Sequence, residues 1–229
     1  MIRLYHQMTL IKKFTGFLLD CILPQRKEVR DIEKISAEEF QNKASRPQNL
    51  FDLEKRDIYP LFSYRSAIVK EAIWQLKYRR NRKIARLLAT VLYEEIVSVL
   101  EDRELFFNFT KPIVIPLPIS KKRRKKRGYN QIEFLLSEFK VLDTENVFEF
   151  LNSILIKSKE TLPQTLMKDR RLRLLNLRGC FEVVGASALK NRNIILIDDV
   201  VTTGSTLLEA KRTLLLRGAK KVICFTLAH

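Results

Sequence analysis

The stretch from Asn193 to Thr206 reads Asn-Ile-Ile-Leu-Ile-Asp-Asp-Val-Val-Thr-Thr-Gly-Ser-Thr, and it decides the fold. Its four consecutive apolar residues, Ile194 to Ile197, are typical of an interior strand of a parallel sheet, which is covered on both faces. Two carboxylates, Asp198 and Asp199, follow directly. Because unpaired charges are unfavourable inside a dry sheet, we expect this acidic pair at the carboxyl edge of the sheet.

A small-residue turn and a helix follow the acidic pair. The turn, Thr202 to Thr206, is rich in hydroxyls and contains Gly204, and a helical pattern then runs to a stop at Gly218. The free N–H groups and the dipole of a helix N-terminus attract anions, and a glycine lets the backbone approach a ligand closely. Neighbouring carboxylates suit sugar hydroxyls or a hydrated Mg²⁺. The arrangement predicts a sugar phosphate ligand; the alternative is an ordinary strand-to-helix turn with a capping threonine.

Length, charge and cysteine content narrow the class of protein. The 229 residues suit one α/β domain with a small appendage, and a net charge of +17 favours polyanionic partners such as nucleotides, diphosphates, nucleic acid or an anionic membrane. The cysteines Cys21, Cys180 and Cys224 are too scattered for a disulfide framework or a zinc site, so we expect no zinc and a cytoplasmic location. No apolar stretch reaches transmembrane length, and we interpret residues 1–24 as an amphipathic helix rather than a signal peptide.

The order of apolar patterns predicts two parts, residues 1–58 and residues 59–229. Residues 25–58 are highly charged, so we expect a linker or a reduced accessory module with one short helix around Ala37 to Lys43. From residue 59 onward, strands alternate with helices, which predicts an α/β fold with a mostly parallel sheet flanked by helices. Helices are expected over residues 67–78, 83–100, 131–139 and 147–154, and strands over residues 61–64, 113–115, 155–157, 181–184, 194–197 and 222–227.

The acidic pair and its turn closely resemble the phosphoribosyl diphosphate (PRPP) signature of type I phosphoribosyltransferases. The motifs Pro116-Leu117-Pro118, Arg127-Gly128-Tyr129-Asn130-Gln131 and Asn176-Leu177-Arg178-Gly179-Cys180-Phe181 resemble the ComF/GntX branch of that family. This resemblance covers residue 59 to the C-terminus and implies phosphoribosyl transfer from PRPP, with Mg²⁺, to an unknown acceptor, and a link to DNA uptake and competence. Members of the branch often carry a four-cysteine zinc module after a start resembling residues 18–24. Here the residues just after Pro24, residues 25–30, contain no cysteine, so the zinc module is lost or degenerate.

The resemblance also implies roles for single residues. Asp198 and Asp199 would be catalytic and contact the ribose hydroxyls, and the 5-phosphate would sit in the following loop. The implied PRPP-binding residues are Asp198, Asp199, Val200, Val201, Thr202, Thr203, Gly204, Ser205 and Thr206. Further candidates for contacts with the pyrophosphate or the acceptor are Lys77, Arg79, Arg127, Asn130, Gln131, Gln164, Asn176 and Arg178. The alternatives are that Lys77 and Arg79 are solvated charges at a helix end and that the Asn130–Gln131 pair only caps a helix.

Seven consecutive basic residues, Lys121 to Arg127, stand out in the sequence. Because like charges repel one another, we expect an exposed, mobile loop that either is only solvated or neutralises phosphates. This run supports a second class of function, a non-catalytic protein with the PRPP-binding fold that binds single-stranded DNA. A membrane-docked helper that uses the N-terminal helix is a third and weaker interpretation. The sequence contains no signal for an oligomeric state.

Overall fold

The computed structural model describes residues 27–102, 109, 111–159 and 177–229. A five-stranded sheet has the order β1-β7-β6-β2-β3, and every neighbouring pair in it is parallel. Its strands are β1 (Ile58–Phe62), β2 (Ile113–Pro116), β3 (Glu149–Phe150), β6 (Asn193–Val200) and β7 (Lys221–Ala228). The strands β4 (Leu155–Lys157) and β5 (Phe181–Val183) form a separate antiparallel pair. The predicted α/β class with a mostly parallel sheet is therefore confirmed.

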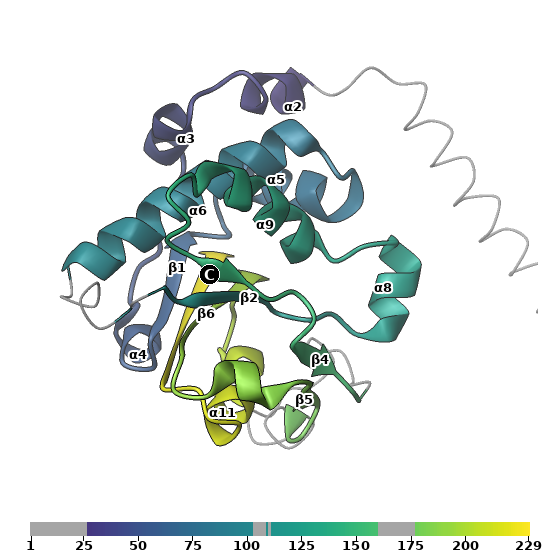
Figure 1. The fold of residues 1–229 in the computed structure, drawn as a ribbon. Coiled ribbons are helices and arrows are strands. Elements are labelled where there is room, and N and C mark those ends of the chain that lie inside the picture. Colours follow the sequence, from purple (N-terminus) through teal and green to yellow (C-terminus); the bar gives the residue numbers. More distant parts are fainter. Residues whose placement is uncertain (1–26, 103–108, 110, 160–176) are drawn as a thin grey trace, which may run out of the picture.

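Helices cover both faces of the sheet (Figure 1). On one face lie α2 (Lys27–Ile32), α3 (Ala37–Lys43), α5 (Ala67–Tyr78), α6 (Arg82–Asp102) and α9 (Gln131–Leu142). The other face packs against α4 (Phe51–Glu54) and α11 (Ser205–Leu216), with the 3-10 helix η2 (Ala186–Leu189) in the same core. In β6, Ile195 and Ile197 belong to the first core while Ile194 and Leu196 belong to the second. This alternation explains why the strand is apolar without interruption.

The predicted helices form where apolar residues recur at helical spacing. α5 spans the expected residues and buries Val69, Ala72, Ile73 and Leu76, which share one face at this spacing. α9 begins directly after Asn130, whose side chain accepts a hydrogen bond of 3.0 Å from the N–H of Ile132. α5 therefore ends, and α9 begins, near the carboxyl edge of the sheet, at positions that local sequence determines.

None of the helices in the described ranges is both long enough and apolar enough to cross a membrane. Even α6, with 21 residues, pairs one buried face with a charged one. The buried face, which includes Leu88 and Leu92, belongs to the core beside the sheet.

The segment before β1 packs into the main core. Val29, Ile32 and Phe40 are buried together with residues of α5 and α6, and the Phe40 ring meets Phe62 of β1 edge-on at 5.5 Å between centroids. A helix was expected only at 37–43; α3 lies there, and α2 and α4 are additional. Full burial of a phenylalanine side chain stabilises a fold by about 1.5–3 kcal/mol. The apolar residues here are few and divided among short helices, which is why no sustained apolar face is visible in the sequence.

The basic run forms a helix, so the prediction of a mobile loop was wrong. α8 (Lys121–Arg127) has Ser120 as its N-cap, and the Ser120 hydroxyl accepts from the N–H of Arg123 at 3.4 Å. Gly128 ends the helix in the left-handed conformation, at φ +84°, and donates to the carbonyl of Arg124 at 2.7 Å. Lysine and arginine are good helix formers, and their exposed charges are screened by water and salt. At the protein surface, repulsion between like charges therefore costs less than capping and helix propensity contribute.

The helix expected over residues 147–154 was also wrong. β3 lies there instead and pairs with β2, with Ile113 opposite Glu149. The Asp143 carboxylate accepts hydrogen bonds from the N–H groups of Val147 and Phe148, at 2.9 and 3.1 Å, and directs the chain away from α9. A short apolar run is compatible with either a helix or a strand, and here pairing with the distant β2 decides between them.

Candidate functional site

The acidic pair lies in the last residues of β6, at the carboxyl edge of the sheet. The neighbouring strands β2 and β7 end at the same edge, with Pro116 opposite Ile197 and Ala228 opposite Val200. Side chains alternate along a strand, so Asp198 and Asp199 point to opposite faces of the sheet. Asp199 points to the face that α5 and α9 cover, as its contacts with both helices show.

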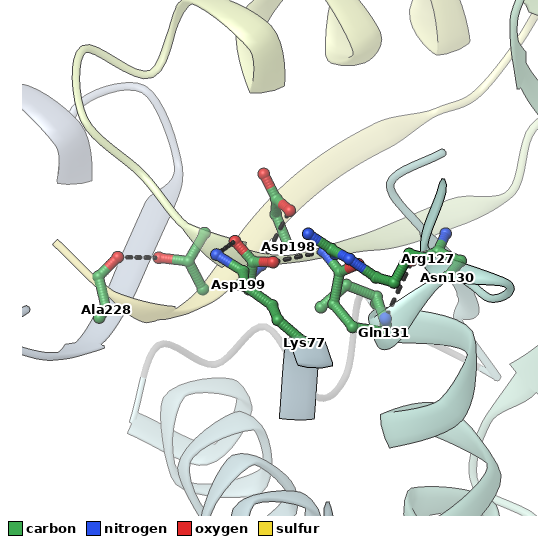
Figure 2. A network of polar contacts seen from close by, with 9 residues as sticks. Lys77, Arg127, Asn130, Gln131, Asp198, Asp199 and Ala228 are labelled. Carbon is green, nitrogen blue, oxygen red and sulfur yellow. Dashed lines mark hydrogen bonds and ion pairs between the residues drawn. The ribbon is translucent and has the colours of Figure 1, made fainter. Parts of the chain in front are cut away.

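Asp199 is the centre of a network that joins three segments (Figure 2). The ammonium of Lys77, from the last turn of α5, lies 2.9 Å from one carboxylate oxygen of Asp199. The amide nitrogen of Gln131, the first residue of α9, donates to the other oxygen, and Arg127 in turn donates to the amide oxygen of Gln131. Asp199 is 7% exposed, so these charged and polar groups interact where water screens them poorly.

Asn130 and Tyr129 hold the start of α9 in place. Besides capping the helix, the Asn130 amide donates to the carbonyl of Leu117 at 3.1 Å, just beyond the end of β2. The Tyr129 hydroxyl donates to the carbonyl of Leu76 in α5. The residues from Arg127 to Gln131 are therefore fastened to both β2 and α5, and Asn130 positions its neighbour Gln131.

Asp198 has a carboxyl group with an unusual protonation equilibrium. Burial, together with the neighbouring Asp199 carboxylate, raises the pKa of Asp198 from 3.8 to about 8. A hydrogen bond of 2.8 Å from the N–H of Asp199 to the Asp198 carboxylate opposes this rise, as do the charges of Lys77 and Arg123. Without a ligand, this carboxyl group therefore holds its proton at pH values where an ordinary aspartate is ionised.

The turn after β6 requires a glycine at position 204. Gly204 precedes α11 with φ +75°, a left-handed conformation that glycine adopts without strain. A Cβ atom there would lie 3.1 Å from Ile58 Cδ1 of β1 and 3.4 Å from Leu53 Cδ2 of α4. At the start of the helix the hydroxyls of Thr203 and Ser205 lie 2.8 Å apart. Space and conformation both disfavour a side chain at this position. The first turn of α11 follows directly, with N–H groups of the kind that attract anions.

The residues present fit Mg²⁺ that arrives with a diphosphate ligand. In the described part of the chain no three His, Cys, Asp or Glu residues form a group that could hold a metal ion. Mg²⁺ commonly keeps several waters and binds through one or two carboxylates together with substrate phosphates, and the pair Asp198 and Asp199 supplies that number of carboxylates. Of the cysteines, burial raises the pKa of the Cys224 thiol to about 12, which disfavours the thiolate that binds zinc. Cys21 lies outside the described residues, and the absence of zinc stays a prediction.

Of the remaining candidates, Arg79 and Arg178 are exposed and two others lie outside the described residues. Arg79 is exposed at the end of α5, where its guanidinium carbon lies 5.2 Å from the centre of the Trp74 ring. Arg178 is exposed before β5, and the N–H of its neighbour Gly179 donates to Glu209 of α11 at 2.7 Å. Gln164 and Asn176 lie outside the described residues, as do residues 1–26. The candidates that gather around Asp199 are Lys77, Arg127, Asn130 and Gln131.

Two exposed aromatic residues beside α8 were not singled out from the sequence. Trp74 and Tyr78 of α5 are 41% and 59% exposed, and their ring centroids lie 5.6 Å apart. The guanidinium carbon of Arg127 lies 5.3 Å from the centre of the Tyr78 ring, so this aromatic pair adjoins the basic helix. We call Trp74, Tyr78 and α8 together the α5–α8 surface. Trp74 and Tyr78 are four residues apart in α5 and lie outside its apolar face. This spacing is the sequence signal that identifies them as an exposed aromatic pair.

Comparison with known proteins places the chain among phosphoribosyltransferase-like relatives. The family described as "Phosphoribosyl transferase domain" matches residues 146–229. Competence protein F of Haemophilus influenzae is 32% identical over 161 residues, which cover 69% of this chain and 66% of that protein. DNA utilization protein YhgH of Escherichia coli O157:H7 is 30% identical over 68% of this chain and 66% of its own length, and competence protein ComFC of Bacillus subtilis is 31% identical over 70% and 59%. The chain thus spans about two thirds or less of the length of these relatives.

Proposed function

Because this chain belongs to the ComF family of phosphoribosyltransferase-like proteins, we propose that it binds PRPP and transfers the phosphoribosyl group to an acceptor. The observation that supports this most is the placement of an acidic pair and a glycine turn at one sheet edge. Lys77 and Arg127 are gathered beside Asp199 at the same edge. The cations suit a pyrophosphate, the carboxylates suit ribose hydroxyls, and the turn at the start of α11 suits a 5-phosphate.

In the proposed reaction, the bond between the anomeric carbon of ribose and the pyrophosphate oxygen breaks, and the acceptor atom forms a new bond to that carbon as pyrophosphate leaves. Positive charge then builds up on the ribose ring and negative charge on the leaving group, as in glycoside cleavage. Lys77 and Arg127 neutralise the leaving pyrophosphate, while Asp198 and Asp199 hold the ribose in one orientation. Mg²⁺, when bound with PRPP, supplies further neutralisation of the pyrophosphate oxygens. We propose that the protein acts in the cytoplasm.

A calorimetric titration tests the binding step. Replacement of both Asp198 and Asp199 by asparagine should weaken binding of PRPP with Mg²⁺ by at least about tenfold, because two charged acceptors become neutral ones that bind hydroxyls and hydrated Mg²⁺ more weakly. Glu182→Gln, an exposed carboxylate on β5, is the matched control and should bind as the wild type does. An unchanged affinity in the double variant would remove the assignment. Pyrophosphate release with a panel of bases then identifies the acceptor.

The α5–α8 surface favours a second candidate function, the binding of single-stranded DNA. Proteins that bind single strands without sequence preference combine a basic groove with aromatic side chains on which bases stack. Here the first six residues of α8, all of them cations, are exposed beside Trp74 and Tyr78. The names of two relatives, a competence protein and a DNA utilization protein, support a role in handling DNA. The two functions share Arg127, which belongs to α8 and to the proposed pyrophosphate site, while the phosphate turn involves different residues.

The salt dependence of oligonucleotide binding tests this second function. For single strands, log affinity falls with log salt with a slope of about 0.7 per phosphate contact. Replacing Lys122, Arg123, Arg124 and Lys125 by serine should flatten the slope and have a much smaller effect on PRPP affinity. Tyr78→Ala should cost about 1–3 kcal/mol of binding free energy, the range for one stacked base. A folded quadruple variant that binds the oligonucleotide as tightly as wild type at every salt concentration would exclude α8 as the contact.

A further inference from the structure

Gln131 connects the two halves of the proposed PRPP site. Its amide oxygen accepts from the guanidinium of Arg127, on the proposed pyrophosphate side. Its amide nitrogen donates to the carboxylate of Asp199, on the proposed ribose side. The guanidinium of Arg127 also lies over the Tyr78 ring, and Gln131 connects this cation to the acidic pair.

The polarity of this link requires a side chain that both accepts and donates hydrogen bonds. A guanidinium offers only donors and a carboxylate only acceptors, so the bridging group must accept at one end and donate at the other. A carboxamide does both in one rigid plane, and its orientation is determined once both partners are present. Gln131 is 4% exposed and begins α9 behind the cap at Asn130, so its backbone position is fixed as well.

We propose that Gln131 is a positioning residue that couples Arg127 to Asp199, so that the pyrophosphate half of the site influences the ribose half. The inference rests on the proposed function and adds a regulatory property to that site. While Arg127 donates to Gln131, the amide of Gln131 is held against Asp199 and the carboxylate keeps one orientation. When Arg127 is removed, the amide is free to turn, and the ribose-binding carboxylate loses a fixed partner.

Ribose 5-phosphate with Mg²⁺ is the probe that separates this coupling from direct contact. It keeps the ribose and the 5-phosphate of PRPP but has no pyrophosphate, so a residue that only contacts pyrophosphate cannot change its affinity. Arg127→Met should weaken ribose 5-phosphate binding about threefold to tenfold, the range for one hydrogen bond. Lys126→Met, which removes the same charge from an exposed neighbour on α8, should leave the affinity unchanged within about twofold.

Variants at position 131 test the same link without removing a positive charge, because glutamine is neutral. Gln131→Met should weaken ribose 5-phosphate binding as Arg127→Met does, and the double variant should be no weaker than either single variant, because both changes break one relay. Gln131→Glu should bind more weakly than Gln131→Met, since it keeps an acceptor for Arg127 but places a second carboxylate against Asp199. Arg127→Lys, which can still donate to Gln131, should recover part of the affinity. Thermal unfolding of each variant verifies that the fold is retained.

The possible outcomes separate this inference from the proposed function. PRPP binding by the wild type, together with an unchanged ribose 5-phosphate affinity in Arg127→Met, would overturn the relay and leave the proposed function standing. Losses that multiply in the double variant would also overturn it, because they would show two independent contributions. A wild-type protein that binds neither PRPP nor ribose 5-phosphate would overturn the proposed function and the relay together.

Discussion

The substitution Asp198→Asn should stabilise the ligand-free protein at alkaline pH. The pKa of Asp198 is about 8 in the folded protein, against 3.8 for an ordinary aspartate. A carboxyl group whose pKa is raised by folding stabilises the fold while it is protonated, so its contribution is complete below about pH 4 and is lost as the pH rises towards 8. Asparagine resembles the protonated acid at every pH and does not suffer this loss.

The size of the effect follows from the shift and from the exposure of the side chain. Each unit of pKa corresponds to about 1.4 kcal/mol, so the full shift would imply a loss of several kcal/mol. Because Asp198 is only half-buried, water screens the unfavourable charge, and we expect about 1–2 kcal/mol. This amount is still a large fraction of the stability of a typical domain.

Urea unfolding at about pH 4.5 and about pH 8.5 measures this difference. The free energy of unfolding of Asp198→Asn relative to wild type should rise by about 1–2 kcal/mol between the two conditions. Glu182→Gln removes an exposed carboxylate and should show no such change. If the asparagine variant follows the wild type at both pH values, the Asp198 carboxyl is ionised at neutral pH and the reasoning about its burial fails.

Three further predictions follow from the packing and from the cysteine content. Gly204→Ala should lower stability by about 1–2 kcal/mol and weaken PRPP binding, because a Cβ would meet Ile58 Cδ1 at 3.1 Å in a left-handed conformation. Thermal unfolding measures the first effect and calorimetry the second, and an unchanged melting temperature would contradict the prediction. Phe40→Ala should cost about 3–5 kcal/mol in urea unfolding, since the ring is fully buried, and a loss below about 1 kcal/mol would show that residues 27–46 fold apart from the sheet. Metal analysis of the purified protein should find no stoichiometric zinc, and a chelator should leave the melting temperature unchanged; about one zinc per chain would show that residues 1–58 were misinterpreted.

The strands and helices nearest the site could be predicted because local patterns determine them. The apolar run before Asp198 is buried on both sides, and a strand covered on both faces has no polar alternation. α5 is predictable for a similar reason, since one apolar face at helical spacing is enough to define it. An element whose conformation depends on its own residue pattern can therefore be predicted from the sequence alone.

The structural features that could not be predicted from the sequence depend on contacts with residues far away in the sequence. β3 is a strand because β2 pairs with it, and the packing of Gly204 depends on Ile58 and Leu53, which no local pattern associates with the turn. The link from Gln131 to Asp199 joins a helix start to a strand end and becomes visible only in three dimensions. The basic helix α8 is a different case, since its capping residues were present in the sequence but like-charge repulsion was given too much weight.

β7 lies between β1 and β6, so β1 can join the sheet only after nearly all of the described chain exists. Ile58 of β1 pairs with Cys224 of β7, and contacts between such distant residues form slowly because a long loop must close first. The turn at Gly204 packs against the same Ile58, so it gains this packing in that late step. A nascent chain on the ribosome would thus contain the acidic pair and the turn without a formed phosphate site until β7 emerges. Under the proposed function, PRPP binds only the completed fold and protects it, by mass action, from unfolding.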